Sequence, residues 1–244
     1  MHSRIRWWLE TKQKMKFFCV YTEQISKSVE GLERCIESGK KLGIDISPYK
    51  SVWCKDTENE AKKLGLKLKY KPSSSSTTNF DKKLAPETRI ANGITHFKLY
   101  EYSVKTNTPI AILEHDAYFV GNPPDPIDDG IIQISCTNSQ WTAKTLYECS
   151  RANKMKKYEP KRNYDWDWIK KEGVIVHPLS GMNSTSGYIV GPKAALRMVE
   201  YLRSDGIGFA DRVRSAHIGE GNLYLQNPQS VICDHSIKSI GEIK

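Results

Sequence analysis

Two carboxylates one residue apart, Glu114 and Asp116, form the part of the chain best suited to chemistry. They directly follow the apolar residues 110–113, which predict a short buried strand. In open α/β sheets ligands gather beyond the carboxyl ends of strands, and in an extended segment residues i and i+2 point the same way. The pair could therefore converge on one divalent cation or one sugar nucleotide, with His115 directed elsewhere. The alternative is a strand end followed by an ordinary acidic turn.

The elements that must position this pair alternate between strand and helix. Strands are also predicted at 16–21, 51–53, 66–70, 131–135 and 188–190. Helices are predicted at 26–41, from Pro86 through Tyr100, and onward from Pro192, because of apolar spacing and proline at helix starts. The charged stretch 57–64 is a further predicted helix. This order predicts an α/β fold with a mixed or mostly parallel sheet. The tail from Asn227 shows turn character without periodicity.

The composition bounds the class of protein and its partners. A chain of 244 residues is long enough for one large α/β domain or two small ones. Its formal charge of +9 favours anionic partners, such as nucleotide diphosphates, nucleic acid or anionic lipid head groups. No segment approaches the roughly 20 apolar residues of a membrane span, and the amino terminus does not resemble a signal peptide, so we predict a cytoplasmic location. The six cysteines contain no C-x-x-C pair, which argues against structural zinc and fits reduced, mostly buried thiols.

We predict a single domain over residues 15–244, preceded by an appended segment, 1–14. That segment is either an extension without a role in the fold or a short amphipathic anchor helix. Residues 72–79 form a polar loop, either a lid over a site or a slack connection. Residues 140–171 form a basic aromatic insertion, which can bind an acceptor through cations and rings or can simply pack on the body. The candidate acceptor-binding residues in it are Lys156, Lys157, Trp166 and Trp168.

Three blocks of the chain resemble glycosyltransferase family 25, which includes lipooligosaccharide galactosyltransferases and collagen galactosyltransferase-like proteins. Residues 93–96 (GITH) are similar to its G-C-x-x-S-H helix, residues 112–117 (ILEHDA) to its I-L-E-D-D-A, and residues 186–195 (SGYIVGPKAA) to its G-x-x-G-Y block. They follow the family's order, and the resemblance spans residues 17–240. Thr95 stands where serine is usual, and His115 replaces the central aspartate of the DxD-like triplet. Imidazole is a tolerable ligand for Mn²⁺, but this change leaves a catalytically degenerate binding module as an alternative.

The resemblance implies a GT-A type fold, with a Rossmann-like, mixed and mostly parallel sheet flanked by helices. It also implies a metal-dependent, inverting glycosyltransferase that moves a sugar from a nucleotide donor, UDP-linked in our prediction, to a glycan, lipooligosaccharide or other hydroxyl acceptor. Mn²⁺ or Mg²⁺ would be held by Asp116, while Glu114 would bind the metal or the donor ribose. Four further residues are expected to form the donor site: Thr95, His96, Gly187 and Tyr188. His96 can alternatively be a satisfied core histidine.

Inverting transfer requires a base that takes the acceptor's proton, and the resemblance makes Asp211 the candidate. Its alternative role is a helix cap beside Arg212 and Arg214. His235 is expected as a distal metal ligand, with His177 and His217 as alternatives. A competing function is a DNA-modifying glycosyltransferase acting on a hydroxylated base, which the basic aromatic insertion would suit.

Overall fold

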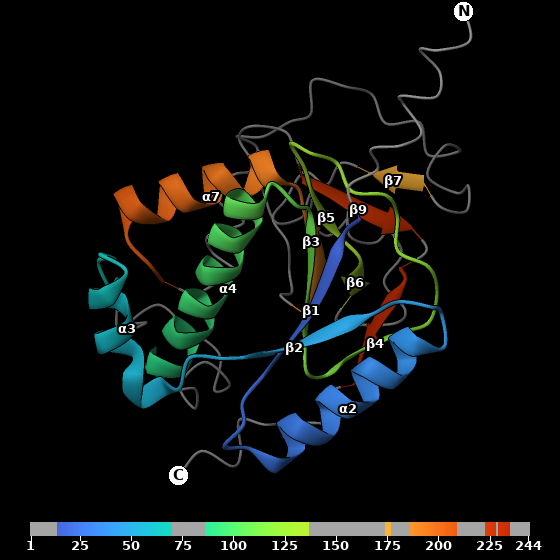
Figure 1. Cartoon of the computed structure of the whole chain (residues 1–244), viewed down its shortest axis with the longest axis horizontal. Coiled ribbons are helices and arrows are strands. Elements are labelled where there is room, and N and C mark those ends of the chain that lie inside the picture. The colour runs from blue at the N-terminus through green and yellow to red at the C-terminus, as the bar shows by residue number, and fades with distance from the viewer. Residues whose placement is uncertain are drawn as a thin grey trace, which may run out of the picture.

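A computed structural model describes residues 14–69, 86–136, 174–176, 186–208, 223–227 and 229–234 of the protein. Strands and helices alternate along most of this part of the chain, as Figure 1 shows. The helices are α2 (Ser26–Lys40), α3 (Thr57–Lys63), α4 (Pro86–Thr106) and α7 (Pro192–Asp205), with a short 3-10 turn, η1 (Cys54–Asp56), before α3. The strands are β1 (Lys16–Tyr21), β2 (Ile46–Lys50), β3 (Ile110–Glu114), β4 (Ala117–Phe119), β5 (Ile131–Gln133), β6 (Ser135–Cys136), β7 (Val174–Val176), β8 (Gly187–Val190), β9 (Leu223–Asn227) and β10 (Val231–Cys233).

The described strands form two sheets. Seven of them make the central sheet in the order β2-β1-β3-β8-β5-β9-β7, and three make a smaller sheet in the order β4-β10-β6. In the central sheet β8 runs antiparallel to its neighbours β3 and β5, and β7 runs antiparallel to β9. The other five of these seven strands share one direction. The predicted α/β class, with a mixed and mostly parallel sheet flanked by helices, is therefore confirmed.

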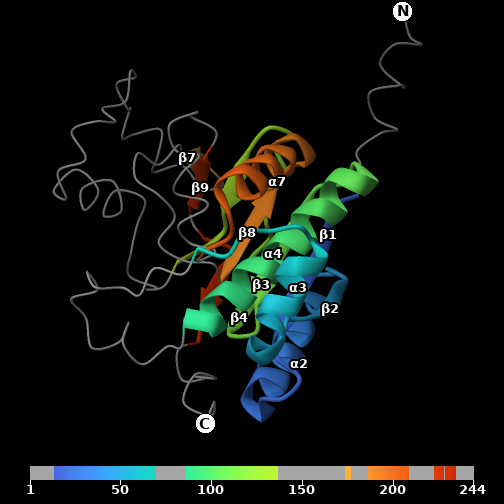
Figure 2. The same cartoon turned by 90° about the vertical axis from the view of Figure 1, so that its left-hand side faces the viewer.

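Different helices cover the two faces of the central sheet (Figures 1 and 2). Successive side chains of a strand point to opposite faces. Ile110 and Ile112 of β3 pack in the cluster that α4 and α7 complete, whereas Ala111 and Leu113 pack in the cluster that α2 and the smaller sheet complete. The same alternation assigns Glu114, the next even-numbered residue of β3, to the α4 face.

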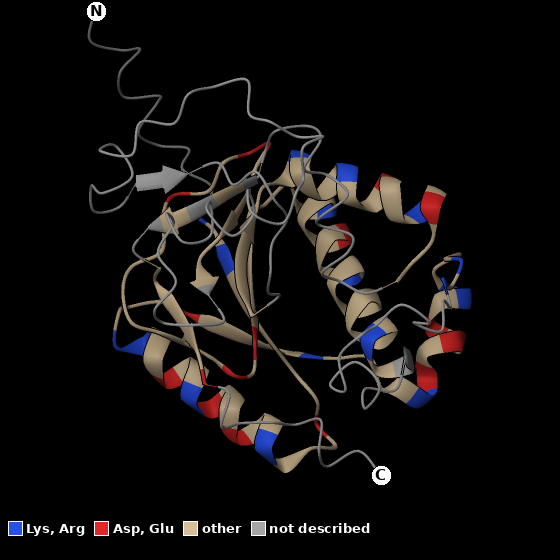
Figure 3. Cartoon of the chain, turned by 180° about the vertical axis from the view of Figure 1, so that it is seen from behind, with Lys and Arg blue, Asp and Glu red and all other residues tan. Residues whose placement is uncertain are grey.

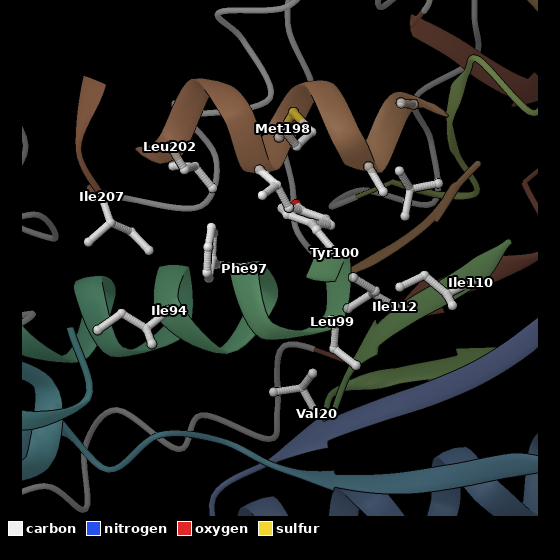
Figure 4. Packing of buried hydrophobic residues seen from close by; sticks show 14 of the residues in the cluster. Val20, Ile94, Phe97, Leu99, Tyr100, Ile110, Ile112, Met198, Leu202 and Ile207 are labelled. Carbon is white, nitrogen blue, oxygen red and sulfur yellow. The ribbon is translucent and has the colours of Figure 1, made fainter. Parts of the chain in front are cut away.

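The contact between α4 and α7 supplies much of the core on this face. Phe97 and Tyr100 of α4 meet Met198 and Leu202 of α7, and Ile112 of β3 lies beneath them (Figure 4). All five side chains are at most 1 % exposed. Burying a large apolar side chain of this kind contributes about 1.5–3 kcal/mol relative to leaving it in water. The packing therefore holds α4 firmly against the sheet.

Three local predictions are wrong. The second strand covers Ile46–Lys50 rather than 51–53. The sequence did not predict it there because Pro48 lies inside it. Proline is tolerated there because β2 lies at the edge of the sheet and, among the described strands, pairs only with β1. In place of a strand at 66–70, the described residues show an isolated bridge between Leu68 and Ile207. The tail contains β10, a three-residue strand too short for its pattern to be visible in the sequence.

The described helices carry charged residues on their outer faces. Lys and Arg alternate with Asp and Glu on the outer faces of the helices (Figure 3). None of the described helices is long and apolar enough to cross a membrane, and the cytoplasmic location stays a prediction. Among the described cysteines, Cys19, Cys35 and Cys233 are buried and free. Residues 1–13, the loop 72–79 and the whole insertion 140–171 lie outside the described residues.

Candidate functional site

Glu114 ends β3 at the carboxyl edge of the sheet, next to Val20 of β1 in the strand register. On the α4 face its Oε1 accepts a hydrogen bond of 3.0 Å from Nδ2 of Asn92, and it lies 4.0 Å from Nε2 of His96. Asn92 and His96 are one helical turn apart, so both project from the same side of α4. The Glu114 side chain remains 20 % exposed, so α4 orients its carboxylate while leaving it accessible to a ligand.

Asp116 lies in the two-residue turn that connects β3 to β4. The strand ends at Glu114, so the extended geometry predicted for the pair does not continue to Asp116. The Asp116 carbonyl oxygen accepts a hydrogen bond of 2.8 Å from the backbone N–H of Asp234, the residue after β10. Asp234 also pairs with Arg34 of α2, whose guanidinium stacks 5.1 Å from the Tyr118 ring. The smaller sheet and α2 together fix the turn.

His115, between the two carboxylates, lies against α2. Its carbonyl oxygen and ring approach Gly31 so closely that a Cβ on Gly31 would overlap the carbonyl. Burial, and secondarily the positive charge of Arg34, lower the pKa of His115 from 6.5 to about 4. The imidazole is therefore neutral at physiological pH, and it packs against α2 instead of joining the two acidic side chains.

The pKa of the Cys233 thiol responds to the negative charges of Glu114 and Asp116. Its pKa is raised to about 12, mainly by burial and further by the negative charges of Asp116 and Glu114, although hydrogen bonds with Ser186 and Ser135 oppose the rise. The thiol therefore stays protonated at neutral pH. Two carboxylates that act on the same buried group create a negative potential, and such a potential favours a bound cation.

Behind Glu114, His96 belongs to a buried hydrogen-bond chain. Its Nδ1 lies 2.7 Å from the hydroxyl of Tyr188 in β8, and that hydroxyl lies 2.7 Å from the hydroxyl of Tyr100 in α4. The His96 and Tyr188 rings are stacked with centroids 5.7 Å apart. All three side chains are at most 1 % exposed. His96 and Tyr188 therefore lie in the core and reach the site surface only through Glu114.

The two remaining predicted donor-site residues are also buried. Thr95 accepts a hydrogen bond of 2.9 Å from the N–H of Val52 and donates one of 2.8 Å to the carbonyl of Ala91, which ties the segment after β2 to α4. Gly187 pairs with Leu113 of β3 in the sheet. A Cβ on Gly187 would lie 3.1 Å from Cβ of Ser135, so glycine allows the smaller sheet to approach β8. Both residues support the backbone around the site.

Three polar residues at this edge were missed by the sequence reasoning. Asn92 holds Glu114, and the hydroxyls of Thr22 and Ser51 lie 2.9 Å apart. Thr22 directly follows β1, and Ser51 directly follows β2. The rule that drew attention to Glu114, that ligands gather beyond strand ends, also applies to these hydroxyls. Asn92 could have been found from its one-turn spacing to His96.

The structure thus places His96, with Tyr188 behind it, next to Glu114 and pairs Gly187 with Leu113 in the sheet, whereas Thr95 contacts the segment after β2. The other predicted site residues lie outside the described residues: Asp211, His235, Lys156, Lys157, Trp166 and Trp168. Within the described residues, no group of three or more His, Cys, Asp or Glu side chains could hold a metal ion. Glu114 and Asp116 provide the hard oxygen donors that Mn²⁺ or Mg²⁺ requires. They fit such an ion as part of a ligand set that further groups must complete.

Comparison with known proteins places the chain in a family. The model of glycosyltransferase family 25, described as an LPS biosynthesis protein, matches residues 21–210, well over half of the chain. The protein belongs to this family and is a glycosyltransferase. The resemblance inferred from the sequence is confirmed, and the observed mixed, mostly parallel sheet flanked by helices is the sheet that the resemblance led us to expect.

Two solved structures share similarity with the chain at low identity. The CTP:phosphocholine cytidylyltransferase of Streptococcus pneumoniae is 14 % identical, with 89 % of this chain and 92 % of that chain covered and a TM-score of 0.39. Mouse xyloside xylosyltransferase 1 is 7 % identical, with 86 % and 83 % covered and a TM-score of 0.38. No curated protein matches the chain significantly. The assignment therefore rests on the family match.

Proposed function

We propose that the protein is a metal-dependent, inverting glycosyltransferase that moves a sugar from a UDP-linked donor to a hydroxyl group of a glycan, a lipid-linked glycan or lipooligosaccharide. One observation carries the proposal. Glu114 is the last residue of a central strand and Asp116 lies in the turn after it, Glu114 is oriented by Asn92, and both carboxylates act on one buried thiol. Such a negative corner at the carboxyl edge of the sheet suits the cation that accompanies a nucleotide diphosphate.

Asp116 is the proposed metal ligand, and Glu114 the proposed contact to the donor ribose or to the same metal. A bound Mn²⁺ or Mg²⁺ would offset the charge that develops on the departing diphosphate. The hydrogen bond from Asn92 keeps the Glu114 carboxylate in one orientation, which reduces the entropy lost when a donor binds. His235 is the proposed third ligand, and it is the next residue in the chain after Asp234, whose N–H bonds to Asp116.

Asp211 is the proposed base. It would take the proton of the acceptor hydroxyl as that oxygen attacks the anomeric carbon. The support comes from the residues that precede it. Ile207 bonds to the Lys67 carbonyl at 2.7 Å, and the Gly208 carbonyl packs so closely on Gly93 of α4 that a Cβ there would overlap it. Gly93 adjoins Asn92, so the chain is held beside the Glu114 site three residues before Asp211.

The acceptor is proposed to contact Lys156, Lys157, Trp166 and Trp168, because cations and aromatic rings together bind sugars and their anionic substituents. The same residue types would suit the alternative acceptor, DNA with a hydroxylated base. Binding to duplex DNA at graded salt concentrations distinguishes the two acceptors. An affinity that is negligible even at low salt would remove the DNA alternative.

The function is tested by screening nucleotide-sugars for metal-dependent hydrolysis, since water can replace an unknown acceptor. We expect hydrolysis of a UDP-sugar that requires Mn²⁺, stops with EDTA and is lost in Asp116→Asn. The matched control is Asp45→Asn, which makes the same change at an exposed position before β2. Undiminished turnover in Asp116→Asn would refute the proposed role. Tight binding of UDP and Mn²⁺ without any turnover would instead indicate the binding module.

A further inference from the structure

With a neutral His96, the hydrogen-bond chain behind Glu114 has two proton arrangements. Each tyrosine hydroxyl has one proton to donate, and a neutral imidazole has one protonated and one unprotonated nitrogen. In the first arrangement Tyr100 donates to Tyr188, Tyr188 donates to Nδ1 of His96, and Nε2 carries the proton. In the second, Nδ1 of His96 donates to Tyr188, and Nε2 presents a lone pair.

The position of Glu114 favours the first arrangement. Its Oε1 lies 4.0 Å from Nε2 of His96, and the imidazole is only 1 % exposed. A lone pair directed at a carboxylate in a poorly solvated place is repulsive, whereas an N–H dipole directed at it is attractive. Nδ1 must then accept a hydrogen bond, and the Tyr188 hydroxyl lies at 2.7 Å from it as the donor.

We propose that Tyr100 and Tyr188 are positioning residues that hold His96 in the tautomer protonated on Nε2, so that the imidazole N–H and the Asn92 amide together orient Glu114. The two donors come from successive turns of α4, and the relay behind His96 crosses from α4 to β8 and back. Tyr100 is 1 % exposed and Tyr188 fully buried. Neither can contact a nucleotide, so an effect of their hydroxyls on donor binding is indirect, and the hydrogen bonds lead from them to His96.

This assignment has a consequence that rests on the proposed function. If Glu114 contacts the donor or its metal, removing one hydroxyl from the relay weakens donor binding although the altered residue never touches the ligand. Loss of one neutral hydrogen bond predicts a roughly three- to tenfold effect. The effect should be larger for Tyr188→Phe, which contacts His96 directly, than for Tyr100→Phe.

The first measurement does not depend on any activity. ¹⁵N NMR of the imidazole nitrogens in the full chain, with His96 assigned through the spectrum of His96→Gln, reports which nitrogen carries the proton. We expect protonated Nε2 and unprotonated Nδ1 in the wild type, and a mixture of tautomers in Tyr188→Phe. The control is Tyr102→Phe, a change on the same helix outside the relay; its ring packs on Phe18 at 5.2 Å. Protonated Nδ1 in the wild type, or an unaltered tautomer in Tyr188→Phe, would overturn the proposal.

The second measurement is calorimetric titration with UDP and Mn²⁺. We expect weaker binding to Tyr188→Phe and unchanged binding to Tyr102→Phe at equal thermal stability. Equal affinity of wild type and Tyr188→Phe, despite a changed tautomer, would overturn the positioning role. If the wild type binds no UDP at all, the proposed donor is wrong, and the NMR result still decides whether the relay sets the tautomer.

Discussion

Asn92 Nδ2 donates a hydrogen bond to Glu114 Oε1 over 3.0 Å and so couples helix α4 to the acidic end of β3. Glu114 is the last residue of a strand, where a carboxylate would otherwise adopt several rotamers. The bond selects one of them, and α4 is held in place by its packing on α7 and the sheet. The orientation of the carboxylate thus depends on the core.

Replacing Asn92 with aspartate tests this coupling. The variant is nearly isosteric but places a second carboxylate beside Glu114, so attraction becomes repulsion. Hydrogen bonds to charged groups are worth about 1.5–3 kcal/mol, so we expect kcat/KM for the nucleotide-sugar to fall about tenfold or more. Asn122→Asp makes the same change at an exposed position and should leave kcat/KM unaltered. Wild-type kcat/KM in a folded Asn92→Asp protein would contradict the coupling.

Gly31→Ala should destabilise the protein, although alanine normally favours a helix by about 1 kcal/mol over glycine. The new Cβ would overlap the His115 carbonyl, and α2 or the turn must move. Overpacking of this kind costs about 1–3 kcal/mol, which urea unfolding can measure. Gly121→Ala is the control, because its nearest neighbour would be 3.9 Å away. A Gly31→Ala protein as stable as the wild type would show that this contact is not tight.

His115 should make stability fall at acidic pH. Its pKa is lowered from 6.5 to about 4 in the folded protein, so below pH 6.5 the unfolded chain binds a proton that the folded protein does not. The contribution of His115 to the free energy of unfolding is therefore fully present above pH 6.5, the pKa in the unfolded chain, and is lost as the pH falls from 6.5 toward about 4. The shift corresponds to a loss of about 3 kcal/mol by pH 4. Urea unfolding at several pH values should show a shallower decline for His115→Asn, and parallel curves would contradict the burial of a neutral imidazole.

Gly93→Ala should impair turnover through the segment that leads to Asp211. A Cβ on Gly93 would overlap the Gly208 carbonyl, a backbone atom that cannot rotate away. We expect residues 206–208 to shift and kcat to fall. UDP binding near Glu114 and Asp116 should fall less than kcat does. Steady-state kinetics and calorimetry separate the two effects. Unchanged kcat would remove the structural support for Asp211 as the base.

Much of the fold could be predicted from local pattern. The apolar runs located β1 and β3, the helical spacing located α2, the charged stretch 57–64 located α3, and prolines marked the starts of α4 and α7. These elements are long or strongly patterned, so their sequences favour one structure whatever surrounds them. The sequence did not predict β2, because Pro48 lies inside it, or β10, because three residues are too few to show a period. Both are strands because they pair with neighbouring strands.

The sequence by itself determined that Glu114 and Asp116 follow a buried strand and that the surrounding blocks resemble those of a glycosyltransferase family. It did not show what holds them. Only the tertiary structure paired Glu114 with Asn92, turned His115 toward Gly31 and joined His96 to Tyr188, 92 residues later in the chain. Periodicity encodes which face of an element is buried, whereas side-chain partners between distant segments depend on how those faces pack in three dimensions.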